Sequence, residues 1–202
     1  MPERNYNQNC ALARATDLLG ERWTLLIVRD LLIAPRRFVE LEQRLKGAGT
    51  NLLAKRLKDM RSAGLITGGG ARSPYRLTQV GQALEPMVLE LIRWSLHWVR
   101  GAKAPDGMYF PDWDLLALKS LFVPNPKLRD AMVARFQKDG WTAWIRVDRQ
   151  GYTFGLGEPE QTPDIDFPCA IPDLRLPGRI ISVLNQKTKE KARQLLACFP
   201  LA

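Results

Sequence analysis

The sequence predicts an α+β protein with two domains, and three observations support this prediction. Apolar residues recur at three- and four-residue spacing from residue 10 to residue 63, which is the period of amphipathic helices. Two short β-prone segments joined by a glycine-rich connection follow at 65–78. Alternating apolar residues return at 141–156. With 202 residues, the chain is long enough for one or two domains.

Four helices are expected in the first part of the chain. Gly20 and Gly64 act as stop signals for the first and the fourth. Pro35 fits the first position of the third helix, and Thr50 is expected to cap the fourth. The turn Gly47-Ala48-Gly49 separates these two helices. The expected ranges are 10–20, 23–34, 35–46 and 51–63.

A hairpin and a long helix complete the expected first domain, residues 1–102. Strands are expected at 65–67 and 75–78, joined by a flexible basic tip. Residues 79–100 are expected to form one helix with a kink at Pro86. The apolar residues of this helix cover more than one stripe, so part of its surface is available for a partner.

The remaining residues, 103–202, are expected to form a small α+β domain. A hairpin is expected at 141–156, with its turn at Asp148-Arg149-Gln150-Gly151, and a further strand near 166–170. Apolar periodicity predicts the helices of this domain. Their expected ranges are 112–122, 127–138, 177–185 and 187–198.

The charge distribution points to a polyanionic partner for the first domain. The formal net charge is +9. Residues 1–102 hold 16 basic and 9 acidic side chains, whereas residues 103–202 hold 14 and 12. A basic domain joined to a nearly neutral one is typical of proteins that bind nucleic acid through the basic part.

Several function classes lack support in the sequence. The chain has three cysteines and one histidine, without zinc-ligand spacing, so we expect neither a metal site nor a cofactor. It also lacks a phosphate-binding glycine motif and a nucleophile–base pair, and its alternating aspartates are typical of solvated surface, so we expect no enzyme. These aspartates are Asp112, Asp114, Asp164 and Asp166. Because no apolar run approaches the ~20 residues of a membrane span, we expect no membrane partner and a cytoplasmic location.

The order of helices, turn, helix and hairpin predicts a winged helix-turn-helix. In this fold the fourth helix would enter the DNA major groove and the third would brace it on the backbone. The expected base-reading face is Thr50, Asn51, Ala54, Lys55 and Lys58. The expected backbone contacts are Arg36, Arg37, Arg56, Arg72, Ser73 and Arg76. A basic amphipathic helix is also typical of plain solvated surface, and Arg56 could instead pair with Glu40 or Glu42.

The first half of the chain, about residues 5–100, resembles the HxlR family of bacterial transcription regulators. The resemblance rests on Leu18-Leu19-Gly20-Glu21-Arg22-Trp23-Thr24-Leu25-Leu26-Ile27, on Pro35-Arg36-Arg37-Phe38 and on Tyr75-Arg76-Leu77-Thr78. It implies a sequence-specific regulator that binds a pseudo-palindromic double-stranded operator as a homodimer, with terminal helices packed across the two-fold axis. Cys10 matches a position at which several family members sense oxidants or electrophiles. The alternative for Cys10 is a small thiol packed at the dimer interface.

The second domain more distantly resembles the sterol-carrier-like domains that some of these regulators carry. Such domains enclose an apolar tunnel, so the resemblance implies a small apolar ligand. The candidate pocket residues are Phe122, Met132, Phe136, Trp141, Trp144, Phe154 and Phe167. They equally fit an ordinary hydrophobic core. An alternative function is therefore a lipid or small-molecule carrier whose basic domain docks to a partner.

Overall fold

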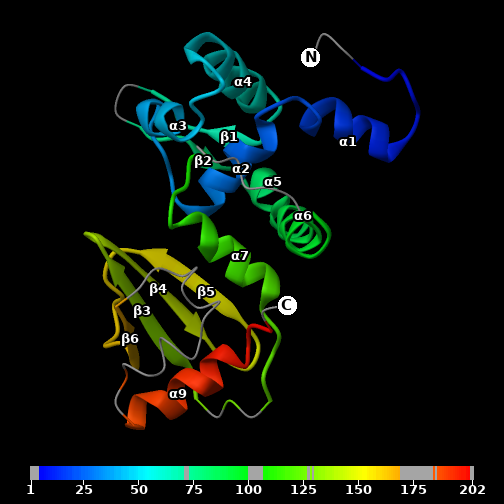
Figure 1. Ribbon diagram of the computed structural model, residues 1–202. Coiled ribbons are helices and arrows are strands. Elements are labelled where there is room, and N and C mark those ends of the chain that lie inside the picture. Colours follow the sequence, from blue (N-terminus) through cyan, green and yellow to red (C-terminus); the bar gives the residue numbers. More distant parts are fainter. Residues whose placement is uncertain are drawn as a thin grey trace. The chain divides into compact units, whose positions relative to one another are not determined.

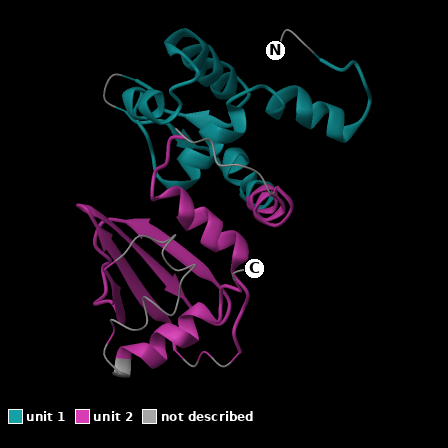
Figure 2. Ribbon diagram, viewed as in Figure 1, with its two compact units in different colours: residues 1–88 teal, residues 89–202 magenta. Residues whose placement is uncertain are grey.

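The computed structural model describes residues 5–70, 73–99, 107–126, 128, 130–168, 184 and 186–200. The chain divides into two compact units, residues 1–88 and 89–202 (Figure 2). The division lies inside helix α6 (Glu85–Trp98) rather than in the segment after residue 100, where the sequence had placed the domain boundary.

Unit 1 contains the four expected helices, within a few residues of the expected ends (Figure 1). They are α1 (Ala11–Leu19), α2 (Thr24–Ile33), α3 (Phe38–Arg44) and α4 (Thr50–Ser62). Gly64 follows α4 with φ +73°, the left-handed conformation that favours glycine at the end of a helix. The fully buried side chains of this unit come from α2, α3, α4 and the segment after α4. They include Ile27, Leu41, Leu53, Leu57, Met60, Leu65 and Ile66.

A buried ion cluster ties α2 to α3. The Asp30 carboxylate, with no exposed surface, accepts a hydrogen bond from Arg44 Nε at 2.7 Å and one from Arg29 Nη2 at 2.9 Å. A carboxylate in this position must keep its partners, because an unpaired charge in the interior is strongly destabilising. The Asp30–Arg44 pair therefore joins the two helices that precede α4.

The wing is a small sheet. Strands β1 (Ile66–Thr67) and β2 (Arg76–Leu77) pair antiparallel, with Ile66 opposite Leu77. Arg36 and Tyr75 extend this sheet through two backbone hydrogen bonds, Arg36 N to Tyr75 O at 3.1 Å and Tyr75 N to Arg36 O at 2.7 Å. The segment that enters α3 is thus bonded to the wing, as the winged helix-turn-helix prediction requires.

The expected single helix at 79–100 is wrong, because two helices occupy this stretch. Thr78 caps helix α5 (Gln79–Gln82), because its Oγ1 accepts a hydrogen bond from Gly81 N at 3.2 Å. Helix α6 starts again at Glu85, so Pro86 lies in its first turn and causes no kink in mid-helix. Proline favours this position because its missing N–H would have no helical partner there.

Unit 2 contains a four-stranded sheet with the order β5-β4-β3-β6. Its strands are β3 (Met132–Lys138), β4 (Trp141–Val147), β5 (Tyr152–Leu156) and β6 (Ile165–Phe167). Only the β3–β6 pair is parallel. The expected hairpin and following strand are present, but the expected helix at 127–138 is wrong because β3 occupies its second half. Asp139 and Gly140 both have positive φ, as a tight hairpin turn requires, and connect β3 to β4.

Helices α7 (Trp113–Leu121) and α9 (Gln186–Leu196) pack against the sheet of unit 2 (Figure 1). Tyr152 of β5 donates its hydroxyl to the Leu115 carbonyl of α7 at 3.1 Å. Lys191 of α9 pairs with Asp164, just before β6, at 2.6 Å. Most of the helix expected at 177–185 lies outside the described residues.

Within the described residues, we find no helix with the length and apolar character that a membrane span requires.

Candidate nucleic-acid interface

Helix α4 has one buried face and one exposed face. Leu53, Leu57 and Met60 are buried. On the other side of the helix, the exposed residues over the first two and a half turns include Thr50, Asn51, Ala54, Lys55 and Lys58. The structure thus brings the five expected base-reading residues together on one accessible face, with two ammonium groups and one amide.

The start of α4 differs from the expectation. Gly49, with φ +67°, occupies the N-cap position, and Thr50 is the first helical residue. The Thr50 hydroxyl donates to Glu42 Oε1 at 2.5 Å and does not cap the helix. The expected cap is therefore wrong, because only glycine readily adopts the left-handed backbone at this turn. Thr50 instead links α4 to α3.

Arg56 does not lie on the exposed face. Its residue surface is 8% exposed, and Nη2 donates to Glu21 Oε2 at 2.7 Å. A weaker contact of 3.6 Å joins Nη1 to Asp59 on the same helix. The expected backbone contact of Arg56 is therefore wrong, since the side chain points into unit 1. The expected alternative partners, Glu40 and Glu42, are not those that the structure shows.

The remaining expected backbone contacts are distributed around the wing and the start of α3. Arg37 is exposed, and its backbone N–H donates to Glu40 Oε2 at 2.6 Å. Arg36 is half-buried, with its backbone in the wing sheet. Arg76 and Ser73 are exposed on the wing. Arg72 lies outside the described residues.

Cys10 is exposed and stands immediately before the first turn of α1. The backbone N–H groups of Ala13 and Leu12 lower the pKa of the Cys10 thiol. Cys198 differs in both respects, because it is buried and burial raises the pKa of its thiol. Since the thiolate is the reactive form, Cys10 has the more reactive environment of the two.

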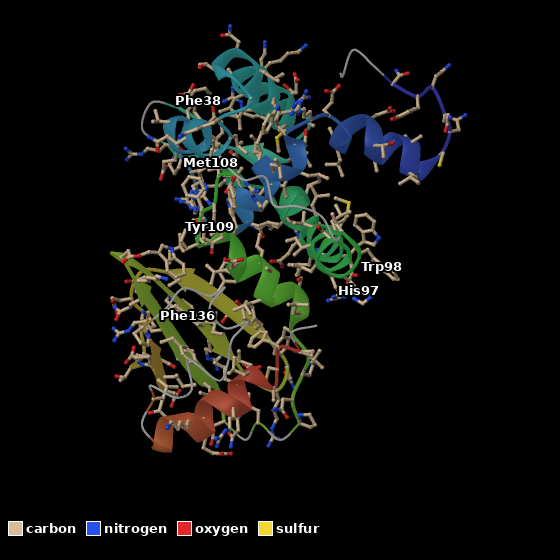
Figure 3. The ribbon with its side chains drawn as sticks, in the orientation of Figure 1. Phe38, His97, Trp98, Met108, Tyr109 and Phe136 are labelled. Atoms are coloured by element: carbon tan, nitrogen blue, oxygen red, sulfur yellow. The ribbon has the colours of Figure 1, made fainter. Side chains whose placement is uncertain are left out.

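Helix α6 carries an apolar seam that the structure leaves exposed. Met87, Leu91, Trp94 and Trp98 recur at spacings of four, three and four residues, which is the pattern of a coiled-coil seam. All four are among the exposed large apolar residues, and Trp98 is 68% exposed. Figure 3 shows Trp98 and His97 projecting from the end of α6, with their rings edge to face at 4.7 Å. Helix α1 is similar, since Leu12 is 71% exposed.

Unit 1 also contains a cavity of about 380 Å³ that the sequence did not indicate. Its walls come from the end of α2 at 31–35, from Arg76 and Leu77 of β2, and from Gln82 and Glu85. These residues share no local motif, because segments distant in the sequence form the cavity. Only the tertiary structure brings them together.

The expected pocket residues of unit 2 do not line a single space. Phe136 lies opposite Ala143 and is fully buried, with its ring stacked on Phe167 at a centroid distance of 5.1 Å. Trp144 lies on the other face of the sheet, because it is the next residue along β4. A Cβ at Gly155 would lie 2.6 Å from the Trp144 ring, which shows that this ring covers the neighbouring strand. Placing Trp144 in the pocket was therefore wrong.

The other expected pocket residues lie on or near the covered face of this sheet. Phe122 is within 6.1 Å of Tyr152 and 6.0 Å of Phe199, measured between ring centroids. Met132 is buried, and Trp141 and Phe154 are half-buried. These side chains take part in packing between the sheet and its helices, which is the ordinary-core alternative.

Comparisons with known proteins concern the first half of the chain. The family model described as HxlR-like helix-turn-helix matches residues 18–103. The HTH-type transcriptional regulator YvaP of Bacillus subtilis is 33% identical over 101 residues, which covers 47% of this chain and 94% of YvaP. The regulator YodB of the same organism is 30% identical over 86 residues, covering 40% of this chain and 77% of YodB. The crystal structure of quinone-bound YodB matches with 31% identity and a TM-score of 0.40, covering 43% of this chain and 96% of that one.

Proposed function

Because the chain belongs to the HxlR-like helix-turn-helix family, it is a DNA-binding transcriptional regulator, and we propose that it reads a two-fold operator as a homodimer. In this proposal α4 of each protomer enters a major groove and the wing contacts the adjacent backbone. Two such helices on one duplex would lie roughly 34–36 Å apart, one turn of B-DNA. Acting on DNA, the protein would work in the cytoplasm.

The observation that carries the proposal is the exposed face of α4. Asn51 supplies an amide that can pair with the edge of adenine, and Lys55 and Lys58 can bond to guanine or to phosphate. Ala54 leaves room for a thymine methyl group between them. Arg37 and Arg76 are exposed on neighbouring elements and suit phosphate contacts, which fix the register without reading sequence.

The apolar seam on α6 supports the homodimer. Two tryptophans, one leucine and one methionine at coiled-coil spacing would bury a large apolar area against a second copy of the same helix. A monomeric protein rarely leaves such a row of large apolar side chains in water. We propose that the exposed apolar residues of α1 extend the same interface.

The experiment combines DNA selection with a measurement of mass. The wild-type protein is used to select duplexes from a random-sequence pool, and the selected duplex is compared with a scrambled duplex by fluorescence anisotropy. Analytical ultracentrifugation gives the mass of the free protein. We expect a two-fold consensus and a dimer. For the double variant Trp94→Ala, Trp98→Ala we expect weaker dimerisation and a lower affinity for the selected duplex. A consensus without two-fold symmetry would contradict the proposal. So would a monomeric protein that binds the selected duplex as tightly as the wild-type dimer is expected to.

We also propose that modification of Cys10 changes operator affinity. The thiol is exposed, has a lowered pKa and lies immediately before α1, whose apolar residues we assign to the dimer interface. A bulky or charged adduct there would disturb how the two copies pack. Alkylated wild-type protein and alkylated Cys10→Ser should therefore differ in operator affinity. Equal affinities would refute this role.

A further inference from the structure

The turn between α1 and α2 contacts both the turn before α4 and α4 itself. Residues 20–23 form this turn, and Figure 1 shows α1 projecting from the rest of unit 1 beyond it. On one side, the Glu21 carboxylate accepts a hydrogen bond from Arg56 Nη2 of α4 at 2.7 Å. On the other, the Trp23 ring lies against Gly47, where a Cβ would be only 2.9 Å from Trp23 Cη2.

Each contact involves a residue in an unusual conformation or environment. Trp23 has φ +79°, a left-handed conformation that residues other than glycine rarely adopt. Arg56 is a buried cation in the middle of α4. Among the described residues, its guanidinium pairs with Glu21 in the α1–α2 turn and with Asp59 on α4 itself. A buried guanidinium needs a fixed anionic partner, so the position of Glu21 constrains where α4 can lie.

We propose that Glu21 is a positioning residue for DNA recognition: through Arg56, it sets α4 relative to the α1–α2 turn. This inference rests on the proposed role of α4. The orientation of α4 then depends on the position of α1, because a displacement of α1 would move the turn that contains Glu21. The exposed face of α4 would then shift against the bases without any change in the residues that contact them.

The chain offers a matched pair of variants to test this. Glu21→Gln removes the carboxylate that joins Arg56 to another element. Asp59→Asn removes the other carboxylate near Arg56, but this one lies on α4 and cannot link it to the turn. Both variants raise the net charge by one, so any general electrostatic gain in DNA affinity is the same for the two.

The readout is the affinity for the selected duplex divided by the affinity for a scrambled duplex. A hydrogen bond between two charged groups is stronger than a neutral one, but here water weakens it because the Glu21 side chain is 36% exposed. We therefore expect Glu21→Gln to lower the ratio about tenfold, which corresponds to ~1.4 kcal/mol. We expect Asp59→Asn to change it less than about twofold. Arg56→Lys keeps the charge but loses the planar fork, and its loss should be intermediate.

Urea denaturation of the same proteins separates positioning from stability. An equal loss of specificity in Glu21→Gln and Asp59→Asn would overturn the proposal, because the effect would then be one of local charge. So would a Glu21→Gln protein that is less stable yet keeps the wild-type ratio. If the wild-type protein selects no duplex at all, the proposed function fails instead, and the two failures are thus distinct.

Discussion

Replacing Lys58 with alanine should make DNA binding less sensitive to salt. Each Lys or Arg that contacts a phosphate releases a counterion, so the logarithm of the affinity falls with the logarithm of salt concentration, with a slope of about −0.9 per phosphate neutralised. The proposed function assigns four exposed cations of each protomer to the DNA, namely Lys55 and Lys58 on α4 and Arg37 and Arg76 on neighbouring elements. A dimer presents these residues twice.

The magnitude follows from this arrangement. If all the cations in the dimer contact phosphate, the slope should be roughly −7, and the affinity should fall ~10⁴-fold between 50 and 200 mM salt. Lys58→Ala removes one contact per protomer, so the slope should become roughly −5 and the fall ~10³-fold. Lys138→Ala is the control, because Lys138 is an exposed lysine at the end of β3 in unit 2.

Fluorescence anisotropy of the selected duplex over a series of salt concentrations gives the slopes directly. We expect Lys138→Ala to keep the wild-type slope. A Lys58→Ala protein with the wild-type slope would show that this face of α4 does not approach the backbone. A reduced slope in Lys138→Ala would show that unit 2 also contacts the DNA, and that the cations of unit 1 do not account for binding on their own.

Three further predictions concern recognition, stability and thiol reactivity. Asn51→Ala should cost about 1–3 kcal/mol of preference for the selected over the scrambled duplex, and an unchanged preference would place the reading face elsewhere. Asp30→Asn should lower the free energy of unfolding in urea by about 3–5 kcal/mol, because it removes the buried negative charge that pairs with the buried Arg44; a loss as small as that of the exposed Asp166→Asn, below ~1 kcal/mol, would contradict this. Iodoacetamide should alkylate Cys10 before Cys198 at neutral pH, and the rate should fall as the pH drops through the lowered pKa of Cys10, where the thiolate becomes protonated. Faster labelling of Cys198, located by mass spectrometry of the peptides, would be the contrary result.

Much of unit 1 could be predicted because its signals are local. Helix α4 has an apolar period, a glycine before it and a glycine after it, so its limits follow from spacing to within one residue and most of its exposed face follows as well. The break between α5 and α6 was missed because the apolar pattern continues through it. A proline in this pattern is compatible with a kink in one long helix and equally with the first turn of a new helix, which is where Pro86 lies.

Unit 2 was harder to predict because a short apolar run fits either a helix or a strand. Strand β3 was expected to be part of a helix, yet the Asp139-Gly140 pair that follows it is a strong hairpin signal. The misplacement of Trp144 has a different cause. Its neighbours Ala143 and Ile145 point to the covered face, so alternation along β4 places Trp144 on the other face, whereas aromatic residue type alone does not distinguish the two faces.

Arg56 illustrates what spacing cannot give. It lies three residues after Leu53, at the border between the exposed and the buried face of the helix. Charge alone favoured an outward position. Its actual partner, Glu21, is 35 residues away in sequence, and no local pattern connects the two. Long-range ion pairs of this kind depend on the tertiary fold.

Helix α6 belongs to both compact units, and this has a consequence for cleavage of the chain. The division after Val88 leaves the first turn of α6 with unit 1 and its remaining turns with unit 2, where Arg93 Nε donates to the Ser120 carbonyl at 2.7 Å. A protease that cut at this division would release a fragment with an intact reading helix but without Leu91, Trp94 and Trp98. Without the proposed dimer interface, such a fragment would bind DNA as a single copy. It would compete with the intact dimer for one half-site of each operator.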